Sequence, residues 1–472
     1  MYKDLYLPIR IMGCSQAENV EELMVKKPLS ISWRTDNCAR LSGEGAWILL
    51  DYGKELAGGI RIVTRAVDQG TGGKGTKVRI TFGESVTEAC TVIGEKNAVN
   101  DHSTRDMTVF VPSMSDLEFG QTGFRFVRID FGAEAQIKCV VAAAEVSRRP
   151  VKYFYNGGDT RIQEIYDAAK RTVDLCVSGG YVWDGVKRDR LVWIGDMAPE
   201  VMALTTLYGR MPVIERSLDF VRDQTPLPGW MNGYPMYSMW WIIALQIYYE
   251  QTGAENYIRK QIPYMTALLR QMDECVAEDG ELGYPSYFVD WPTSGHPEVK
   301  DGARAINIMA VRAAISLLGA FGGETNLAEA LLDKLLKKEI VARGNKKVLG
   351  LKHFATGLSR EEQETLVSGG AKGMSTFMSY YILKAVASFD REAAVGMMKE
   401  YYGAMLDKGA TTFWEDFDME WVPGSGRIDE FPRDGEKDIH GDFGAYCYVG
   451  FRHSLCHGWS AGVIAFMKEE NL

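Results

Sequence analysis

The chain has 472 residues, of which 46% are hydrophobic and 25% are charged. These proportions are typical of a folded globular protein and exclude disordered, collagen-like and fibrous chains. The length allows about two to three domains. The formal charge is −10 and no basic tract is present, which argues against nucleic acid and anionic membranes as partners.

Cysteine usage and the N-terminal residues contain no strong signal. Eight cysteines are scattered without a CxxC pair, which predicts reduced thiols in place of a disulfide scaffold or a zinc site. The first residues, MYKDLYLPIR, lack the apolar stretch of a secretory signal. No window of 18 consecutive apolar residues indicates a transmembrane helix. We therefore expect a cytoplasmic protein without a membrane partner.

Residues 1–150 contain short runs in which apolar and polar residues alternate. The clearest runs are 46–50, 59–63, 78–82, 107–111 and 124–129. A period of two is typical of strands with one buried face. We predict an antiparallel β-sandwich over residues 1–150.

After residue 150 the apolar residues recur every three to four positions, which predicts helices. The predicted helices lie at about 162–176, 197–208, 211–224, 236–252, 256–278, 303–320, 324–343, 375–388, 391–408 and 455–469. Several of them, such as 236–249, are apolar on more than one side and must be buried on both. A double ring of helices, an (α/α)6 barrel, provides that environment. We thus predict a multidomain chain, with an all-α (α/α)6 barrel over residues 151–472 following the sandwich.

The densest cluster of charged and aromatic residues lies directly before the second of these helices. Its members are Trp183, Asp184, Arg188, Asp189, Arg190, Trp193, Asp196 and Glu200. A run of charges is usually a solvated turn, but two Trp side chains make a poor solvated surface. Asp196 would cap the helix, and Glu200 would lie in its first turn, where acidic residues are favoured.

A second cluster, 409–418, places Glu415 directly after Trp414. A carboxylate beside an indole can have a raised pKa through desolvation, or it can face a sugar that is stacked on the ring. The alternative is an acidic helix start after Gly409. Asp290 and Trp291 repeat the pairing, although they could simply anchor a loop.

The histidines His453 and His457 have the spacing HxxxH. That spacing could hold a metal, but the Glu of HExxH is missing. We prefer a structural or substrate-orienting histidine, and we predict neither a metal nor a cofactor. Two acidic residues that are distant in the sequence, each beside Trp on a helical scaffold, are typical of a glycoside hydrolase. Such an enzyme needs one carboxyl group as acid, another as base or nucleophile, and aromatic side chains that line the sugar site. The predicted partner is a carbohydrate.

These motifs resemble those of the α-L-rhamnosidases of glycoside hydrolase family 78. The family's Asp, Arg-Asp-Glu-Arg, Trp and Gly-Asp motif is similar to residues 184–196, and its Thr-Thr-x-Trp-Glu motif is similar to 411–415. A closing Ser-Leu-x-His segment looks like 454–457, and the Asp-Trp pair has a counterpart at 290–291. The Gly-Phe-Arg-Phe-Val stretch at 123–127 resembles the family's β-rich region. The resemblance covers nearly the whole chain.

The resemblance implies an (α/α)6 barrel and an inverting hydrolase that removes a terminal α-L-rhamnosyl or similar deoxy-sugar. It implies Asp189 as general acid and Glu415 as general base. The residues expected to bind the substrate are Asp184, Arg188, Trp193, Asp196, Glu200, Asp290, Trp291, Trp414 and His457. Among these, the acids would hold sugar hydroxyls, the Trp side chains would wall the pocket, and the histidine would orient the substrate.

The acid position departs from the family pattern. The family's general acid is a Glu after Arg-Asp, and this chain is one residue short, so that Asp189 takes the place when one counts back from Trp193. Asp reaches roughly one ångström or more less far than Glu, whereas proton donation needs about 2.6–3.2 Å. Either the loop moves inward, or another acid such as Glu200 substitutes, or the chemistry differs.

Two other functions stay open. One is a non-catalytic sugar-binding pseudoenzyme on the same scaffold. The other is a barrel enzyme of different outcome, such as a phosphorylase or a hydrolase of acidic sugars, for which Arg188 and Arg190 would point into the pocket. The oligomeric state is also open.

Overall fold

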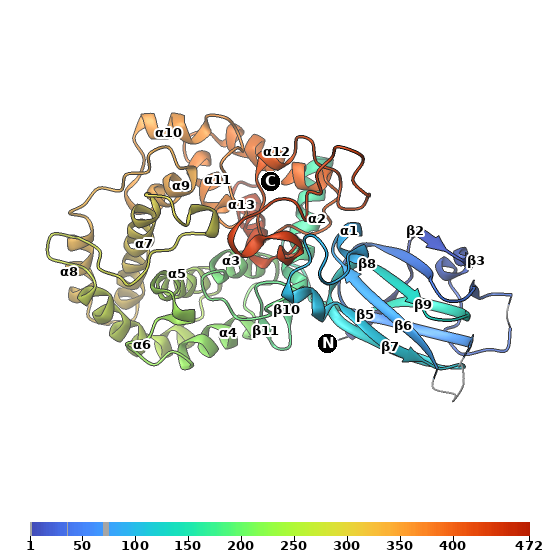
Figure 1. Cartoon of the computed structure of the whole chain (residues 1–472). Helices are drawn as coiled ribbons and strands as arrows, with labels where there is room; N and C mark the ends of the chain where they lie inside the picture. The colour runs from blue at the N-terminus through green and yellow to red at the C-terminus, as the bar shows by residue number, and fades with distance from the viewer. Residues whose placement is uncertain (1, 35, 69–74) are drawn as a thin grey trace.

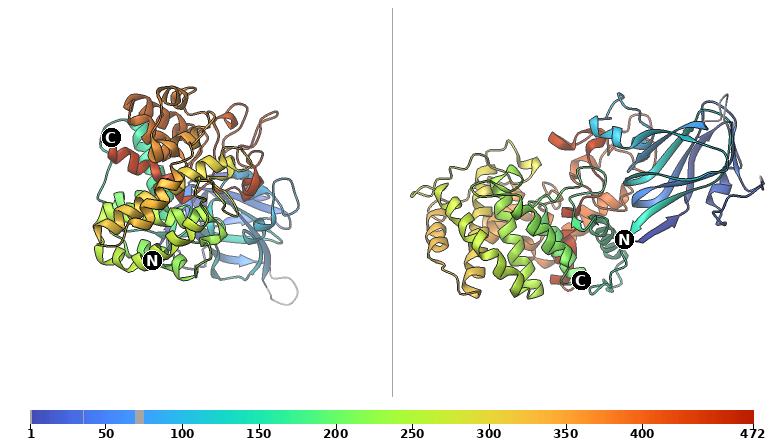
Figure 2. Two further views of the ribbon diagram at one scale, coloured as in Figure 1. Left: turned by 90° about the vertical axis from the view of Figure 1, so that its left-hand side faces the viewer. Right: turned by 90° about the horizontal axis from the view of Figure 1, so that it is seen from below.

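The computed structural model describes residues 2–34, 36–68 and 75–472. An antiparallel sheet lies at one end of a larger helical region (Figures 1 and 2). The strands of the sheet are β1 (Tyr2–Tyr6), β2 (Arg10–Ser15), β3 (Ala17–Glu18), β4 (Ala39–Leu41), β5 (Ala46–Val67), β6 (Thr76–Gly83), β7 (Asp106–Val111), β8 (Asp116–Phe131) and β9 (Ala135–Val146). Their order is β3-β4-β9-β5-β8-β6-β7, with β1 beside β9 and β2 beside β5.

The long strand β5 organises the sheet. The runs 46–50 and 59–63, which the sequence predicts as two strands, are the two halves of this one strand, and register shifts separate them. Gly59 lies at the register shift between Gly58 and Ile60, where a Cβ atom would be 2.3 Å from the backbone oxygens of Phe119 and Gly120. Glycine thus permits the close approach of β5 to β8 at this position.

The helical region follows the sheet in sequence. Its α-helices are α2 (Thr160–Leu175), α3 (Met197–Tyr208), α4 (Pro212–Asp223), α5 (Pro235–Thr252), α6 (Glu255–Glu274), α7 (Val299–Ala320), α8 (Asn326–Leu335), α9 (Lys346–Thr356), α10 (Arg360–Val367), α11 (Ser379–Ala387), α12 (Arg391–Asp407) and α13 (Val463–Glu469). The sequence pattern predicts neither α9 nor α10, and it predicts α8 too long. The predicted helix 455–469 starts as a 3₁₀ helix, Gly458–Gly462, and becomes α-helical at Val463.

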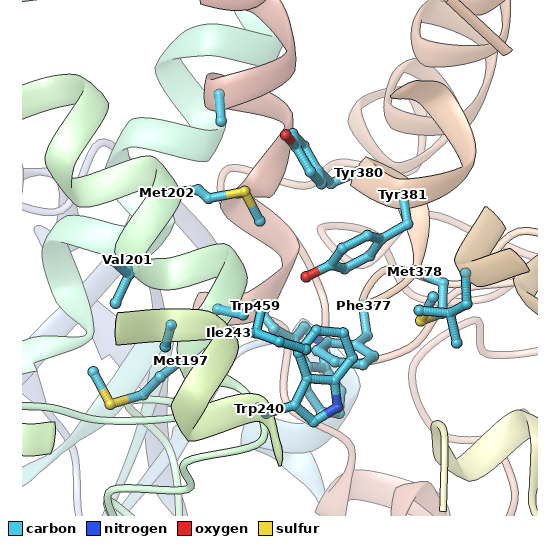
Figure 3. Close-up of a cluster of buried hydrophobic side chains, with 14 of the residues drawn as sticks. Met197, Val201, Met202, Trp240, Ile243, Phe377, Met378, Tyr380, Tyr381 and Trp459 are labelled. Atoms are coloured by element: carbon cyan, nitrogen blue, oxygen red, sulfur yellow. The ribbon is translucent and has the colours of Figure 1, made fainter. Parts of the chain in front are cut away.

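Six of these helices contact one another in cyclic order. The contacts run from α3 to α5, α7, α9, α11 and α13, and then back to α3. All twelve residues of α3 are buried, as expected for a helix with neighbours on every side. Figure 3 shows the side chains that meet between these helices, where Trp240 of α5 packs against Phe377 and Tyr381 with ring centroids 5.5 and 5.4 Å apart.

One helix of the described residues, α7, is long and apolar enough to cross a membrane by length and composition alone. Its best window has a mean hydropathy of 1.4, and 67% of that window is buried within the protein. A buried core helix has the same composition, and α7 packs between α5 and α9.

The sheet touches the helical region through the segments that precede and follow the helices. A short helix, α1 (Val86–Cys90), follows β6 and projects toward the C-terminal segment (Figure 1). Gly123 of β8 donates its N–H to the carbonyl of Val186 at 3.0 Å. Arg125 of the same strand contacts Asp429 at 3.3 Å. These contacts hold the sheet against two segments of the helical region, the loop between α2 and α3 and the segment between α12 and α13.

Candidate active site

A pocket of about 150 Å³ collects residues from most of the motif segments. It is lined by Asp184, Arg188, Asp189, Trp193, Asp196, Tyr234, Tyr237, Trp291, Glu415, Cys447, Arg452, His457 and Trp459. Eight of these are predicted from the sequence, and they come from positions as far apart as 184 and 457. A larger surface depression of about 990 Å³ beside α8 and α9 holds none of the predicted site residues.

The loop before α3 is closed by its own aspartate. Oδ1 of Asp184 accepts the N–H of Leu191 at 3.0 Å, and the N–H of Asp184 donates to the carbonyl of Leu191. Asp189 and Arg190 at the tip have φ angles of +51° and +54°, which are uncommon for residues with a side chain. Asp189 lies in the pocket, whereas Arg190 turns away and donates to the carbonyls of Gln121 and Val186.

Arg188 joins the two clusters of carboxylates. Its guanidinium donates to Oε1 of Glu415 at 2.6 Å and contacts Oδ2 of Asp189 at 3.0 Å. Burial alone would lower the pKa of Arg188, but Glu415 and Asp189 raise it further than burial lowers it. The outer nitrogens of a guanidinium are only about 2.3 Å apart, so the two carboxylates lie within about 8 Å of each other.

Glu415 is held at both its backbone and its side chain. Its N–H donates to the carbonyl of Ser454 at 2.9 Å, and Oε2 accepts the N–H of Ser454 at 3.1 Å. Its carbonyl accepts the indole N–H of Trp459 and the hydroxyl of Thr376. The Glu415 side chain is only 4% exposed. The 409–418 segment is therefore no helix start: it packs beside the C-terminal segment and presents one carboxylate to the pocket.

His457 stands at the centre of the pocket's acidic residues. Its Nε2 lies 3.6 Å from Oε1 of Glu415 and 3.9 Å from oxygens of both Asp184 and Asp196. The ring packs on Trp459 with centroids 4.2 Å apart. Burial, and then the positive charge of Arg188, hold the pKa of His457 well below its ordinary value. The imidazole is therefore neutral at pH 7.

Three buried acids lie on the side of the pocket toward α3. Burial raises the pKa of Asp184, Asp196 and Glu200 well above the ordinary values, and repulsion by neighbouring carboxylates of the pocket adds to the rise in each case. Asp196 occupies the N-cap position of α3, but its side chain makes no capping hydrogen bond and lines the pocket. The predicted capping role is corrected on this point.

Three predicted residues lie outside the pocket. Glu200 is buried behind it, where a Cβ atom on Gly458 would come within 2.0 Å of its Oε1. Asp290 caps a short 3₁₀ helix through the N–H of Thr293 and accepts the hydroxyl of Ser375 at 2.6 Å. Trp414 is fully buried against Phe417 and His453.

The predicted binding roles of these three residues are corrected accordingly. The indole of Trp414 packs against Phe417 and His453, whereas the carboxylate of the next residue, Glu415, lines the pocket. Trp459 supplies the aromatic floor that the sequence assigned to Trp414.

Five further residues line the pocket although no sequence motif predicts them: Tyr234, Tyr237, Cys447, Arg452 and Trp459. Tyr234 and Tyr237 flank Pro235 at the start of α5, and Tyr237 packs edge-on against Trp193. Arg452 lies in the C-terminal segment, 3.6 Å from Asp189. Only Trp459, two residues after His457, stands close enough to a motif to be suspected from the sequence.

One group of side chains in the described part of the chain has the residue types of a metal site. Ligand atoms of Glu84, Glu88 and His440 lie within 4.8 Å of one another. The ammonium of Lys187 lies among them, 3.1 Å from each carboxylate and 3.3 Å from the imidazole. The Lys187 ammonium already occupies the position between these ligand atoms and pairs with both carboxylates, so these residues do not fit a metal.

The fold is that of the glycoside hydrolase family 78 α-L-rhamnosidases, as the motifs predict. A rhamnosidase from Klebsiella oxytoca with rhamnose bound matches with a TM-score of 0.75 at 17% identity, over 100% of this chain and 96% of that one. The GH78 rhamnosidase of Bacillus sp. GL1 matches with a TM-score of 0.71 at 18% identity, over 95% of this chain and 48% of that one.

A third similar structure is the Streptomyces avermitilis α-L-rhamnosidase in complex with L-rhamnose. It matches with a TM-score of 0.65 at 15% identity, over 89% of this chain and 42% of that one. The chain thus spans nearly the whole Klebsiella protein but about half of the other two. No protein-family model and no curated protein matches the sequence.

Proposed function

We propose that this protein is an inverting exo-glycoside hydrolase that removes a terminal α-L-rhamnosyl or similar deoxy-sugar. The observation that carries the proposal is the meeting of Asp189 and Glu415, 226 positions apart in the sequence, in one small pocket. The bound of about 8 Å between their carboxylates admits both the separation of about 6.5–9.5 Å of inverting enzymes and that of about 5–5.5 Å of retaining enzymes, and the resemblance to the rhamnosidase motifs favours inversion. The rhamnosidase fold supports the same reading.

The proposed architecture is a β-sandwich over residues 1–150 and an (α/α)6 barrel over 151–472. The cyclic contacts of α3, α5, α7, α9, α11 and α13 support an inner ring, and the intervening helices would form the outer ring. The last strand of the large sheet ends at Val146, and the first long helix begins at Thr160. The pocket would lie at the end of the ring that faces the sheet. We also propose a cytoplasmic location.

In the proposed mechanism Glu415 removes a proton from a water molecule. The water oxygen forms a bond to the anomeric carbon while the bond from that carbon to the glycosidic oxygen breaks. Asp189 gives its proton to the departing oxygen on the opposite face of the sugar, and the anomeric configuration inverts. The position of Asp189 at the tip of the loop, where it lines the pocket, supports its assignment as the acid.

The pocket fits one neutral sugar ring. Its volume of about 150 Å³ is well below the roughly 300–1,000 Å³ of pockets for drug-sized ligands. Asp184, Asp196 and His457 offer polar atoms for hydroxyl groups, while Trp193 and Tyr237 offer apolar surface for carbon-bound hydrogens and a methyl group. Four carboxyl groups against two arginines line the pocket, which disfavours an anionic sugar.

The alternative functions differ in what they require of the arginines. A phosphorylase or a hydrolase of acidic sugars would need Arg188 and Arg190 free to face the ligand. Arg188 is engaged by Glu415 and Asp189, and Arg190 points elsewhere. That engagement supports one competing proposal, a sugar-binding pseudoenzyme, because Arg188 contacts both of the carboxylates that would do the chemistry.

Release of 4-nitrophenol from a panel of aryl glycosides, beginning with the α-L-rhamnoside, tests the proposal. We expect Glu415→Gln to lower kcat/KM by about 10²–10⁴-fold, because general-base catalysis contributes that much. Glu420→Gln makes the same change at an exposed position nearby and should leave the rate unchanged. ¹H NMR of the first product should show the inverted anomer.

Each other outcome has a definite meaning. Equal rates in wild type and Glu415→Gln would refute the assignment of the base. A wild type that binds L-rhamnose in calorimetry but turns over no glycoside would establish the pseudoenzyme. Aryl groups leave with little acid assistance, so a weak acid alone would not silence the panel.

A further inference from the structure

We propose that Glu84, at the end of β6, is a positioning residue for Glu415, and that the sheet is therefore part of the active site. This inference rests on the proposed function, since it concerns the base of that reaction. Glu84 belongs to the N-terminal sheet and lies 331 positions before Glu415 in the sequence, yet only one residue separates the two carboxylates in space.

That intervening residue is Ser454. Oε2 of Glu84 accepts the N–H of Leu455 at 2.5 Å, and Oε1 accepts the hydroxyl of Ser454 at 3.2 Å. The N–H of Ser454 donates to Oε2 of Glu415 at 3.1 Å, and its carbonyl accepts the N–H of Glu415 at 2.9 Å. Glu84 thus accepts hydrogen bonds from Ser454 and Leu455, and Ser454 in turn is hydrogen-bonded to the proposed base, Glu415.

A second connection runs through Lys187, the residue before Arg188. Its ammonium lies 3.1 Å from Glu84 and donates to the carbonyls of Phe451 and His453, the former at 2.7 Å. The side chains of Glu84 and Lys187 are both 0% exposed. The same acid therefore contacts the two segments that meet at Glu415: the loop that carries Arg188 and the segment 453–455.

Neighbouring charges balance this cluster. Burial would raise the pKa of Glu88, but Lys187 and Arg105 together hold it well below its ordinary value. Glu88 is thus ionised and remains a partner for Lys187 if Glu84 is neutralised. A neutral amide at position 84 would therefore weaken the hydrogen bonds to Ser454 and Leu455, while Lys187 would keep Glu88 as its ion-pair partner. The segment that positions Glu415 would then be held less firmly.

A displaced base lowers the catalytic rate strongly and changes the affinity for the sugar little. A displacement of about 1 Å at a reacting group can cost about 10²-fold, and loss of an outer-shell partner typically costs about 10–100-fold. The carboxylate of Asp184 is fixed by the N–H of Leu191, and Trp193 and Asp196 lie five and eight residues beyond Arg188 along the loop. We therefore expect kcat to fall in Glu84→Gln while the affinity for L-rhamnose is kept.

The first test compares Glu84→Gln with Glu55→Gln in aryl α-L-rhamnoside hydrolysis. Glu55 is a matched control: its side chain is also buried in the sheet near Glu84, but Oε1 has no hydrogen-bond partner among the described residues. We expect kcat to drop about 10–100-fold in Glu84→Gln and to stay near the wild-type value in Glu55→Gln. Equal kcat values in wild type and Glu84→Gln would overturn the inference.

The second test separates positioning of the base from general support of the fold. In Glu415→Ala, added azide can replace the activated water: its nitrogen bonds to the anomeric carbon as the bond to nitrophenolate breaks, and no base is needed. We expect Glu84→Gln to leave this azide-dependent rate unchanged, although it slows the wild-type reaction. A double-mutant cycle expresses this as strong coupling between positions 84 and 415.

If Glu84→Gln slows the azide-dependent reaction as much as the water reaction, Glu84 has only a structural role and the inference is wrong. If Glu415→Ala alone costs no activity, the proposed function fails instead, and the two failures are thereby distinguished. Should Glu84→Gln not yield folded protein, Glu84→Asp enters the same cycle, because it keeps the charge toward Lys187 and shortens the reach to Leu455.

Discussion

The residue after the proposed base is a buried acid with a separate effect. Asp416 does not line the pocket; its N–H donates to Nε2 of His453, and its Oδ1 accepts the N–H of Phe417. Burial, and then the charge of Asp290, raise the pKa of Asp416 to about 7. An acid in the unfolded chain titrates near 3.9, so the folded state binds this proton more tightly than the unfolded state does.

This shift predicts how Asp416→Asn alters stability with pH. The contribution of the protonated Asp416 carboxyl to the free energy of unfolding is fully present below about pH 4 and is lost as the pH rises through about 7. Asn stays neutral and can still accept the N–H of Phe417. We expect the difference in the free energy of unfolding, Asp416→Asn minus wild type, to rise by about 1–3 kcal/mol between pH 4 and pH 8. Urea unfolding at several pH values measures the gain.

Asp434→Asn, at an exposed position, serves as the control for that measurement. A stability difference between Asp416→Asn and wild type that is the same at every pH would contradict the assignment of the tight proton to Asp416.

At the scale of elements, the short helix at Gly458–Gly462 forms the junction between the pocket and the core. The N–H of Gly458 donates to the carbonyl of Asp184 at 2.7 Å. Trp459 of the same helix lines the pocket and packs on Phe377 with ring centroids 5.2 Å apart (Figure 3). This one turn therefore links the loop that carries Asp184, the pocket and the hydrophobic side chains that pack between the helices.

The junction leaves no space for a side chain at position 458. A Cβ atom there would lie 2.0 Å from Oε1 of Glu200, a buried oxygen without a hydrogen-bond partner among the described residues. We expect Gly458→Ala to lower the free energy of unfolding by about 1–3 kcal/mol and to reduce glycosidase activity, because the turn that carries Trp459 must shift.

Gly396→Ala in α12 is the matched control. No atom lies within 4 Å of a Cβ at that exposed helical position, so the variant should be about 0.5–1 kcal/mol more stable than wild type. Thermal unfolding of both variants decides the matter: equal stabilities would show that the position beside Glu200 can accommodate a methyl group.

At the scale of the whole molecule, the sheet and the helices are joined by buried charge. The guanidinium of Arg125 in β8 contacts Asp51 of β5 at 2.8 Å, Asp429 at 3.3 Å and the carbonyl of Gly409 at 3.0 Å. Together with Glu84 and Lys187, it places ion pairs across the whole interface. Such an interface favours cooperative unfolding of both regions.

Removing this guanidinium should weaken both regions together. Arg125→Met leaves Asp51 with a half-exposed Arg10 as its remaining ion-pair partner among the described residues, and breaking a buried pair costs about 3–5 kcal/mol. We expect a single, earlier urea transition by Trp fluorescence, because nine of the eleven Trp residues follow position 150. Arg61→Met removes a similar pair, with Asp116, from the surface and should cost at most about 1 kcal/mol. Equal losses would refute the argument.

Hydrophobic periodicity in the sequence determined the order of strands before helices, because burial on one face or on two leaves a local signal. It located α3, α5 and α12 to within two residues, since each has a long, uninterrupted apolar pattern. It missed α9 and α10, which are short and half polar. The motif residues Asp184, Asp189, Glu415 and His457 were also recognisable, because their residue types and order recur in the rhamnosidases.

Only the tertiary structure decided which of those residues face the pocket. Trp414, Asp290 and Glu200 look like site residues in the sequence and lie outside the pocket, while Tyr237, Arg452 and Trp459 line it without a motif. The role of Glu84 is invisible in the sequence for the same reason. A local pattern reports burial, but direction toward a shared pocket depends on contacts between segments hundreds of residues apart, such as that of Glu84 with Leu455.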